Sequence, residues 1–261
     1  LPPCTSCDPL SEFPLFPCEC IGGITYQPSH HKFADIEEST RAEWIADRIL
    51  ATDQDVVVLN EVFHPKAREA FVNKLGGAYP HYVSLLRGLP PVVIAGPSFG
   101  IFTDYLAEPG HSGLMIFSKY PFKELAGNDI SHDASCSDSA CEWQAWNNGQ
   151  FISDTYFSFK VFDRCGFWDC FASKGVGLVR IKAPFDEVYV AFTHLQADYP
   201  SDDEYFPGAR MSQYADIRSV VRGAIPQKEL PFARVYLVGD FNTIGVGRDT
   251  SINGTTKEWQ S

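Results

Sequence analysis

The sequence contains no run of about 18 consecutive apolar residues, the length that a helix needs to cross a bilayer. We therefore expect no membrane-spanning segment. A basic excess is also missing: 21 Lys and Arg stand against 33 Asp and Glu, a formal net charge of −12. Because nucleic-acid backbones are bound mainly through Lys and Arg, this balance predicts no nucleic-acid partner. A zwitterionic lipid head group carries no net charge, so an acidic protein can still bind one.

The chain begins at Leu1, with neither a start methionine nor a visible signal peptide. We interpret it as a processed or trimmed piece of a longer product. Its 261 residues, 44% of them hydrophobic, suffice for one large α/β domain with a full core. We predict an irregular Cys- and Pro-rich arm over residues 1–35 and a folded domain over residues 36–261.

Eight cysteines predict a disulfide framework, an oxidising compartment and a secreted or extracellular protein. They are Cys4, Cys7, Cys18, Cys20, Cys136, Cys141, Cys165 and Cys170. We expect Cys136–Cys141, Cys165–Cys170 and pairing among the first four; a crossed pattern between the last two pairs is the alternative. A zinc site at the first four is disfavoured, since no His completes it and Cys-x-Cys spacing is poor for zinc. The sequon at Asn253 predicts N-glycosylation.

Three stretches share one pattern, in which an apolar, largely β-branched run ends in polar side chains. They are residues 55–63 with Glu61, residues 188–197 with His194 and Gln196, and residues 235–242 with Asp240 and Asn242. Buried strands of α/β sheets present their chemistry at their carboxyl ends. Taken singly, each has a plainer interpretation: a surface glutamate, a core histidine or an Asx turn. A fourth stretch, residues 169–176, carries Asp169 and Lys174 before a further strand.

Strand-Glu, strand-His-x-Gln and strand-Asp-x-Asn, in this order, resemble the endonuclease/exonuclease/phosphatase superfamily of metal-dependent phosphodiesterases. The wording of residues 55–63, 174–175 and 193–197 is similar to that of neutral and bacterial sphingomyelinases. The resemblance runs from about Thr40 to about Asn242. It implies an α/β fold of four layers, with two packed mixed β-sheets flanked by helices.

The resemblance also implies a role for each site residue. Glu61 binds Mg²⁺ or another divalent cation, a hard ion that takes oxygen ligands. His194 donates to the phosphate as charge builds, Asp240 orients or activates the water, and Asn242 holds the phosphoryl oxygen or the water. Some neutral sphingomyelinases pair an Asp and a Lys at the spacing of Asp169 and Lys174 to switch activity, and we assign these two, with Gln196, to substrate binding or regulation. A plain surface salt bridge is the alternative for that pair.

Local patterns predict the flanking elements. A capping box at Thr40-x-x-Glu43 predicts a helix over residues 40–52, Pro65 opens a second helix, and residues 210–222 form a third as a crossover. The inward residues of the first and third helices are predicted to be Ala42, Ile45, Ala46, Ile49, Leu50, Met211, Tyr214, Ile217 and Val221. Residues 112–118 predict a strand. Two aromatic-rich regions, residues 89–106 and 143–168, are interpreted as core packing or as lipid-facing insertions.

Two features of the resembled family are missing. No Asn precedes Asn60, where that family places a metal-site Asn, and no His follows His194, where it has a final Asp-His pair. We therefore expect terminal strands to be absent from this piece and a further segment or chain to complete the fold. The favoured function is a secreted, Mg²⁺-dependent phospholipase C that hydrolyses sphingomyelin at a phospholipid surface. A catalytically silent structural or adhesion protein is the alternative, and a nuclease or lipid phosphatase is a third reading.

Overall fold

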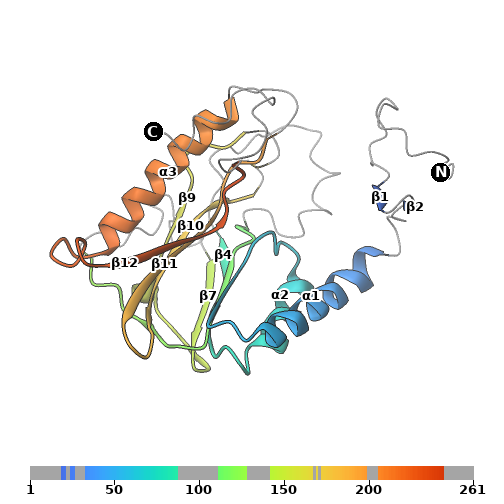
Figure 1. Ribbon diagram of the computed structural model, residues 1–261, viewed down its shortest axis with the longest axis horizontal. Helices are drawn as coiled ribbons and strands as arrows, with labels where there is room; N and C mark the ends of the chain where they lie inside the picture. The colour runs from blue at the N-terminus through green and yellow to red at the C-terminus, as the bar shows by residue number, and fades with distance from the viewer. Residues whose placement is uncertain are drawn as a thin grey trace.

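The computed structural model describes residues 19–21, 24–26, 33–87, 111–127, 142–166, 169, 172–198 and 205–243. Within them, two five-stranded sheets pack face to face and three α-helices cover their outer faces (Figure 1). The predicted four layers are therefore present. No helix of this described part is long and apolar enough to cross a membrane.

The first sheet is antiparallel in every ladder between its described strands. In spatial order its strands are β3 (Val56–Leu59), β5 (Met115–Ser118), β4 (His81–Arg87), β7 (Glu142–Asn147) and β8 (Gln150–Phe151). The prediction of two mixed sheets is wrong for this one. The predicted strand over residues 112–118 begins only at Met115, because the residues before it form a turn that contacts other loops.

The second sheet is mixed. It consists of β12 (Arg234–Asp240), β11 (Glu187–His194), β10 (Gly175–Lys182) and β6 (Phe122–Lys123), with β9 (Phe157–Val161) also paired to β10. Only β11 and β12 run parallel. Helix α3 (Tyr205–Ala224) connects them, so the predicted crossover is present, and a parallel pair requires one. Both strands consequently end at the same edge of the sheet, at His194 and Asp240.

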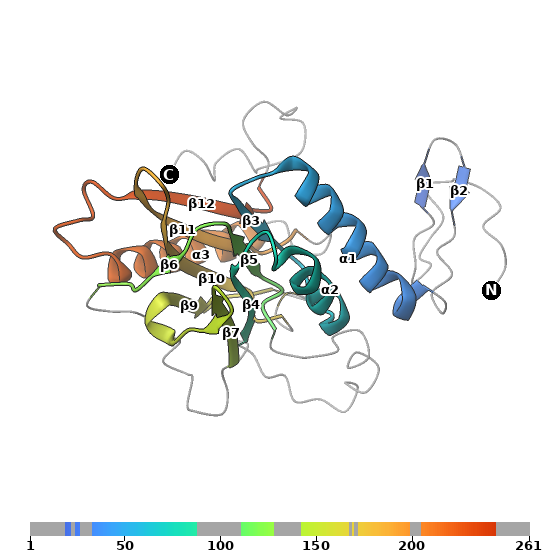
Figure 2. The same cartoon turned by 90° about the horizontal axis from the view of Figure 1, so that it is seen from below.

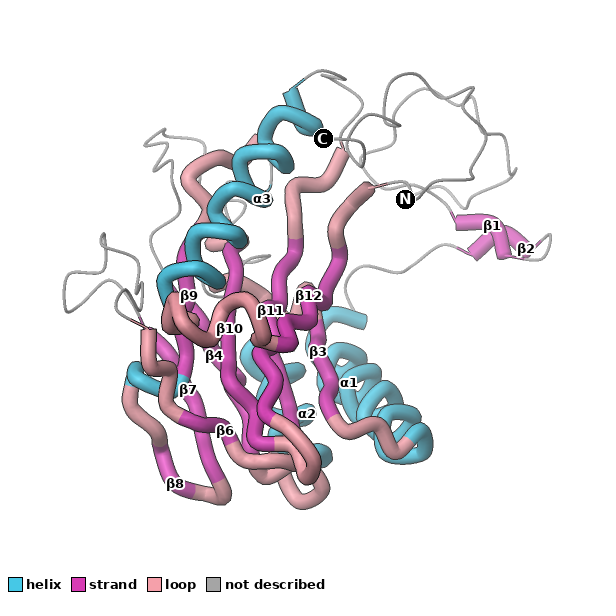
Figure 3. The backbone as a smooth tube through the Cα atoms, turned by 60° about the vertical axis from the view of Figure 1, so that its left-hand side comes forward, coloured by secondary structure: helices cyan, strands magenta, loops and turns pink. Residues whose placement is uncertain are grey.

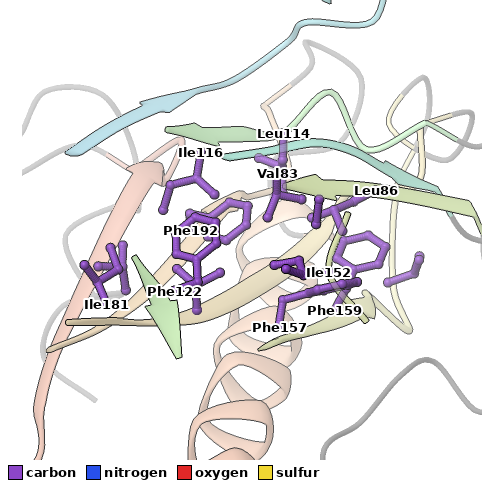
Figure 4. Close-up of a cluster of buried hydrophobic side chains, with 14 residues drawn as sticks. Val83, Leu86, Leu114, Ile116, Phe122, Ile152, Phe157, Phe159, Ile181 and Phe192 are labelled. Carbon is purple, nitrogen blue, oxygen red and sulfur yellow. The ribbon is translucent and has the colours of Figure 1, made fainter. Parts of the chain in front are cut away.

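The main core lies between the two sheets. Ile116 and Val83 of the first sheet meet Phe192 and Phe157 of the second in one buried cluster (Figure 4). Alternation along each strand decides which residues enter it: Ile116 faces inward, whereas its neighbours Met115 and Phe117 pack outward under α1 and α2. Many rings of the aromatic-rich region 143–168 fill this interior, which supports the core-packing reading for them.

The helices cover the outer faces (Figure 3). Helix α2 (Pro65–Leu75) begins at the predicted proline and buries Phe71 and Leu75. Helix α1 (Phe33–Thr52) begins seven residues before the predicted capping box, so Thr40 lies inside the helix. Two predicted inward residues are exposed: Ile45 at 39% and Met211 at 41%. Each lies on the margin of an apolar stripe, where the neighbouring elements decide burial.

The N-terminal region contains a feature that its composition did not predict. Strands β1 (Glu19–Ile21) and β2 (Ile24–Tyr26) form a short antiparallel hairpin within the arm expected to be irregular. The first aromatic-rich region, residues 89–106, lies outside the described residues, as does Asn253.

Candidate functional site

The carboxyl ends of strands from both sheets converge on one histidine. Nε2 of His194, the last residue of β11, lies 3.9 Å from Oε1 of Glu61 and 3.9 Å from Oδ2 of Asp240. The two carboxylate oxygens are therefore at most twice that distance apart, within the reach of about 12 Å that a shared, water-bridged Mg²⁺ site allows. His194 is buried, whereas both carboxylates are largely exposed, so the acidic groups form the rim and the imidazole the floor.

Glu61 has a backbone conformation that favours glycine. It lies two residues past the end of β3 with a φ of 61°, which is uncommon for a residue with a side chain. The amide of the next residue, Val62, donates to the carbonyl oxygen of Gly113 at 2.9 Å and fixes the turn. Strained backbone at strand ends gathers at functional sites, where the surroundings hold it in place.

The turn 111–113 joins the two halves of the site, and the sequence interpretation missed it. Nδ1 of His111 accepts a hydrogen bond from the Gly113 amide at 2.7 Å, while the His111 carbonyl accepts from the Ser173 amide at 3.3 Å. Gly113 has a φ of +69°, and a Cβ there would lie 2.7 Å from the Phe63 ring. The turn thus holds the Glu61 loop on one side and the segment before Lys174 on the other. A glycine directly before the apolar run of β5 was the available signal.

Lys174 and Asp169 form a buried ion pair, not the surface salt bridge that was the alternative. Nζ of Lys174 donates to Oδ2 of Asp169 at 2.8 Å, and both side chains are less than a tenth exposed. The same ammonium contacts the Leu195 carbonyl at 3.1 Å and Nε2 of His194 at 3.2 Å. These three contacts match the three donors of an ammonium group. Asp169 also accepts from the Ala197 amide at 2.7 Å.

Lys174 determines the protonation pattern of the histidine. Since an ammonium has no lone pair, Nε2 of His194 is the acceptor in this contact and the ring proton lies on Nδ1. Burial lowers the pKa of His194, and the positive charge of Lys174 lowers it further. Burial also lowers the pKa of Lys174, while the Asp169 carboxylate opposes that shift. The lowered pKa of His194 favours a neutral imidazole, and the Asp169 carboxylate favours the ammonium form of Lys174 that donates to its Nε2. This arrangement leaves Nδ1 of His194 buried without a hydrogen-bond partner among the described residues.

Asn242 and Asp240 form the Asx turn that the sequence allowed as an alternative. The Asn242 amide donates to Oδ1 of Asp240 at 2.9 Å, and Nδ2 of Asn242 donates to the Leu195 carbonyl at 2.8 Å. The turn leaves Oδ2 of Asp240 as the oxygen nearest His194. The turn and a site role are therefore compatible, because the turn uses only one carboxylate oxygen.

Gln196 lies apart from this group. Its side chain is fully buried, and its amide accepts from the Gly166 nitrogen at 2.6 Å and donates to the carbonyls of Gly166 and Ala197. Both N–H groups of the Gln196 side-chain amide therefore donate to backbone carbonyls. In this structure Gln196 binds the backbone at Gly166, and a contact with substrate would require breaking that link.

A cavity of about 350 Å³ opens beside Glu61, and His194 is not among the residues that line it. Its walls come from α1, the end of β3 and the start of α2, with Phe63 and Phe71 among the apolar residues. Glu38 of α1 faces His64, whose Nδ1 caps α2 by accepting from the Lys66 amide. The Oδ1 of Asn60 is buried here without a hydrogen-bond partner among the described residues.

The donor set suits a hard cation in part. In the described residues no group of three or more His, Cys, Asp and Glu is placed to hold a metal ion. Mg²⁺, however, keeps several waters and is bound through one or two carboxylates together with substrate phosphate oxygens. Glu61 and Asp240 offer two such carboxylates at one rim, so they fit the ion as partial ligands.

Most of the predicted disulfides lie outside the described side chains. Cys165 is disulfide-bonded, while all cysteines that could complete this bond, Cys170 included, lie outside the residues whose side chains are described. The predicted pairing therefore stays a prediction.

Comparison with known proteins assigns this chain to a family. The model of the endonuclease/exonuclease/phosphatase family matches residues 32–260. The chain therefore belongs to this family. Sphingomyelinase C 2 of Leptospira interrogans serogroup Icterohaemorrhagiae serovar Lai is 25% identical over 214 residues, which cover 82% of this chain and 28% of that protein. The chain thus spans less than a third of the length of the curated relatives it matches.

Solved structures show the same fold. SmcL aligns with a TM-score of 0.55 and 20% identity, covering 87% of this chain and 61% of its own. Sphingomyelinase C from Streptomyces griseocarneus aligns with a TM-score of 0.54 and 18% identity, covering 83% of this chain and 61% of its own. A mutant of beta toxin from Staphylococcus aureus with bound magnesium ions also aligns at 0.54, with 20% identity and coverage of 83% and 61%. The sphingomyelinase-like architecture expected from the sequence motifs is confirmed.

Proposed function

We propose that this chain carries part of the catalytic site of a secreted, Mg²⁺-dependent phospholipase C that hydrolyses sphingomyelin to ceramide and phosphocholine. One observation carries the proposal: Glu61 and Asp240 each approach the same Nε2 of His194 in a chain of this phosphodiesterase family. The relatives named sphingomyelinase C supply the substrate class. Glu61 follows a strand of the first sheet, and His194 and Asp240 end strands of the second. A phosphodiester bound at this edge of the sandwich would therefore contact groups from both sheets.

Magnesium is the cofactor that the donors favour. Glu61 would bind it directly, since its carboxylate is exposed at the rim, and the magnesium-bound beta toxin shows that a protein of this fold takes that ion. When bound, Mg²⁺ supplies positive charge to the phosphoryl oxygens as the bond to the leaving group breaks. The remaining steps fall to this chain's own side chains.

Asp240 is suited to orient the attacking water, because its Oδ2 is exposed and not used by the Asx turn. Asn242 is already bonded to Leu195 and would contribute mainly by keeping Asp240 in place. His194 is suited to donate a proton or hydrogen bond to the phosphate, but its Nε2 faces Lys174. Because the proton of the neutral ring lies on Nδ1, donation from Nε2 requires the lysine to move away and Nε2 to take up a proton from solvent, which makes the Lys174–Asp169 pair a control point of the site.

The cysteines support the proposed extracellular setting, and the net charge supports the proposed substrate. A disulfide at Cys165 favours an oxidising, extracellular compartment, and a glycan at Asn253 would be consistent with it. A net charge of −12 suits the neutral head group of sphingomyelin at a phospholipid surface better than a polyanion.

The test measures phosphocholine release from sphingomyelin vesicles by the whole product of the gene, with and without Mg²⁺. Glu61→Gln removes the charge held for the cation while keeping its volume, and we expect release to fall by orders of magnitude. Glu69→Gln, a change at an exposed glutamate of α2, is the matched control and should leave release unchanged. Equal release by Glu61→Gln and the parent would overturn the role of Glu61, and faster cleavage of DNA than of sphingomyelin would favour a nuclease.

A catalytically silent scaffold is the second candidate. It is favoured by the lysine that occupies Nε2 of His194. This candidate predicts no phosphocholine release by any variant together with an intact fold by circular dichroism. Release that depends on Mg²⁺ and on Glu61 would rule it out.

A further inference from the structure

The backbone that follows β11 carries two of the groups that hold the Lys174–Asp169 pair. The Leu195 carbonyl accepts from Nζ of Lys174 at 3.1 Å, and the Ala197 amide donates to Oδ2 of Asp169 at 2.7 Å. The ion pair is therefore bound to backbone on each side of residue 196. A displacement of this short segment would displace the pair with it.

Helix α3 holds the residue between these two groups. The amide of Gln196 donates to Oε1 of Gln213 at 2.9 Å, and its carbonyl accepts from Nη1 of Arg210 at 2.9 Å. The same Nη1 donates to Oδ1 of Asp198 at 2.7 Å. Helix α3 itself contacts β9 and β10 of the second sheet, so it offers a firm support (Figure 2). Two side chains of one helix thus bind both backbone polar groups of Gln196.

Both helix side chains are buried, and one of them is charged. Arg210 is fully buried and Gln213 nearly so, whereas Asp198, the carboxylate partner of Arg210, is half exposed. Arginine is almost never fully buried unless it is paired. A buried charge is weak evidence for stability, because apolar side chains of similar volume often serve as well. It does fix geometry, since the planar guanidinium donates in set directions.

The position of the lysine decides which nitrogen of His194 carries the proton. Lys174 donates to Nε2 at 3.2 Å, which leaves the ring proton on Nδ1. Nδ1 is buried and has no hydrogen-bond partner among the described residues. A buried donor without a partner is costly, so this tautomer persists only while the lysine holds Nε2. Without that contact the favoured tautomer carries its proton on Nε2, the atom that Glu61 and Asp240 approach.

We propose that Arg210 and Gln213 are positioning residues that set the tautomer of His194. They hold the backbone to which the Lys174–Asp169 pair is bound, and the pair in turn holds Nε2 of the imidazole. The contacts therefore run without a gap from α3 through one backbone segment to the ion pair and the histidine. Neither side chain touches the imidazole, so both act only through these intermediates. The inference does not depend on the proposed activity.

The experiment determines the tautomer by nitrogen NMR of the whole gene product, prepared with isotope-labelled histidine. Spectra are taken without added divalent cation at about pH 8, where imidazole groups are neutral. In a neutral ring only one nitrogen carries the proton, so the two nitrogens give separate signals that identify the tautomer. The signals of His194 are assigned among the seven histidines by their loss in His194→Gln. We expect the parent protein to carry the proton on Nδ1.

Variants of α3 then test the positioning role. Arg210→Met and Gln213→Met each remove one contact with the Gln196 backbone, and we expect each to raise the fraction of His194 with its proton on Nε2 at least about fivefold. Arg210→Lys keeps a cation able to donate to the Gln196 carbonyl and should restore part of the parent pattern. Arg218→Met, at an exposed arginine of the same helix, is the matched control and should leave the tautomer unchanged. Gln213→Asn, which shortens the amide by one methylene, is the milder variant if the methionine variants do not fold.

Three results would overturn the inference. One is a parent protein whose His194 carries its proton on Nε2, because the lysine would then not set the tautomer. Another is a folded Arg210→Met or Gln213→Met protein, judged by circular dichroism, whose His194 signals match the parent, because the role would then be structural only. The third is a change in Arg218→Met as large as in Arg210→Met, which would trace the effect to the loss of any positive charge from α3. Lys174→Met should reproduce the change seen in the two α3 variants.

Discussion

The ammonium nitrogen of Lys174 lies 3.2 Å from Nε2 of His194, the atom that both rim carboxylates approach. A buried cation thus faces the imidazole that would contact the phosphate in the proposed hydrolysis. Asp169, at 2.8 Å, neutralises the lysine and sets its position. Under the proposed function, the state of this ion pair would decide whether Nε2 of His194 accepts from the lysine or contacts a substrate.

The buried pair gives a first prediction. Lys174→Met leaves the Asp169 carboxylate buried without its cation, and we expect the free energy of unfolding to fall by about 3–5 kcal/mol. The double variant Lys174→Met/Asp169→Asn should recover much of this loss, because no unpaired charge remains. Lys74→Met, which breaks the exposed pair with Asp47, should cost less than about 1 kcal/mol. Urea unfolding measures all three, and equal losses at Lys174 and Lys74 would contradict the burial argument.

A second prediction concerns pH. His81, at the opposite end of the first sheet, contacts Asn147, and burial lowers its pKa while that hydrogen bond opposes the shift. As pH falls below about 6.5, the unfolded imidazole binds a proton before the folded one does. The unfolded state then holds more protons, so the free energy of unfolding should decrease towards lower pH.

His194 contributes with the same sign, since its pKa is also lowered. The variant His81→Gln should therefore reduce, but not abolish, the loss of stability between about pH 7 and 5. Urea titrations at a series of pH values give the comparison. A parent protein that becomes more stable over this interval would contradict the shift.

The turn at residues 111–113 gives a third prediction. Gly113→Ala adds a Cβ that would lie 2.7 Å from the Phe63 ring at a φ of +69°. We expect a loss of about 1–3 kcal/mol from strain and overpacking, together with weaker Mg²⁺ affinity through displacement of the Glu61 loop. Gly149→Ala is the matched control, with a φ of +76° and no atom within 4 Å. It isolates the backbone cost, so similar effects of the two changes would show that contact with Phe63 is unimportant.

The fourth prediction concerns the disulfides. Peptide mapping of the unreduced protein by mass spectrometry should recover Cys165 joined to Cys170 and Cys136 joined to Cys141. Cys165 is bonded in the structure, and a partner five residues away closes a loop of modest entropic effect. A disulfide-linked peptide that joins Cys136 or Cys141 to Cys165 or Cys170 would support the crossed alternative instead.

Sequence alone determined the parts of this protein that depend on local pattern. An apolar run followed by a polar group predicts a strand with that polar side chain at the sheet edge, and Glu61, His194 and Asp240 lie at or just past such ends. The predicted burial holds for β11 alone of the three strands, since β3 is half-buried and β12 is exposed. Proline at position 65 fixed the start of α2 because its ring suits the first helical turn. The three strand-end motifs, in their order along the chain, also predicted the family.

Tertiary structure decided what neighbours impose. The exposure of Ile45 and Met211, the early start of α1 and the antiparallel first sheet depend on which elements pack together. The five-residue spacing of Asp169 and Lys174 marked the pair, but its burial and its contact with His194, twenty residues further along, depend on other segments, so no local spacing shows them. Gln196 matched the motif but is held by the Gly166 backbone, thirty residues earlier in the chain. Such contacts form only when strands from separate parts of the chain meet, and they decide which polar groups remain available for chemistry.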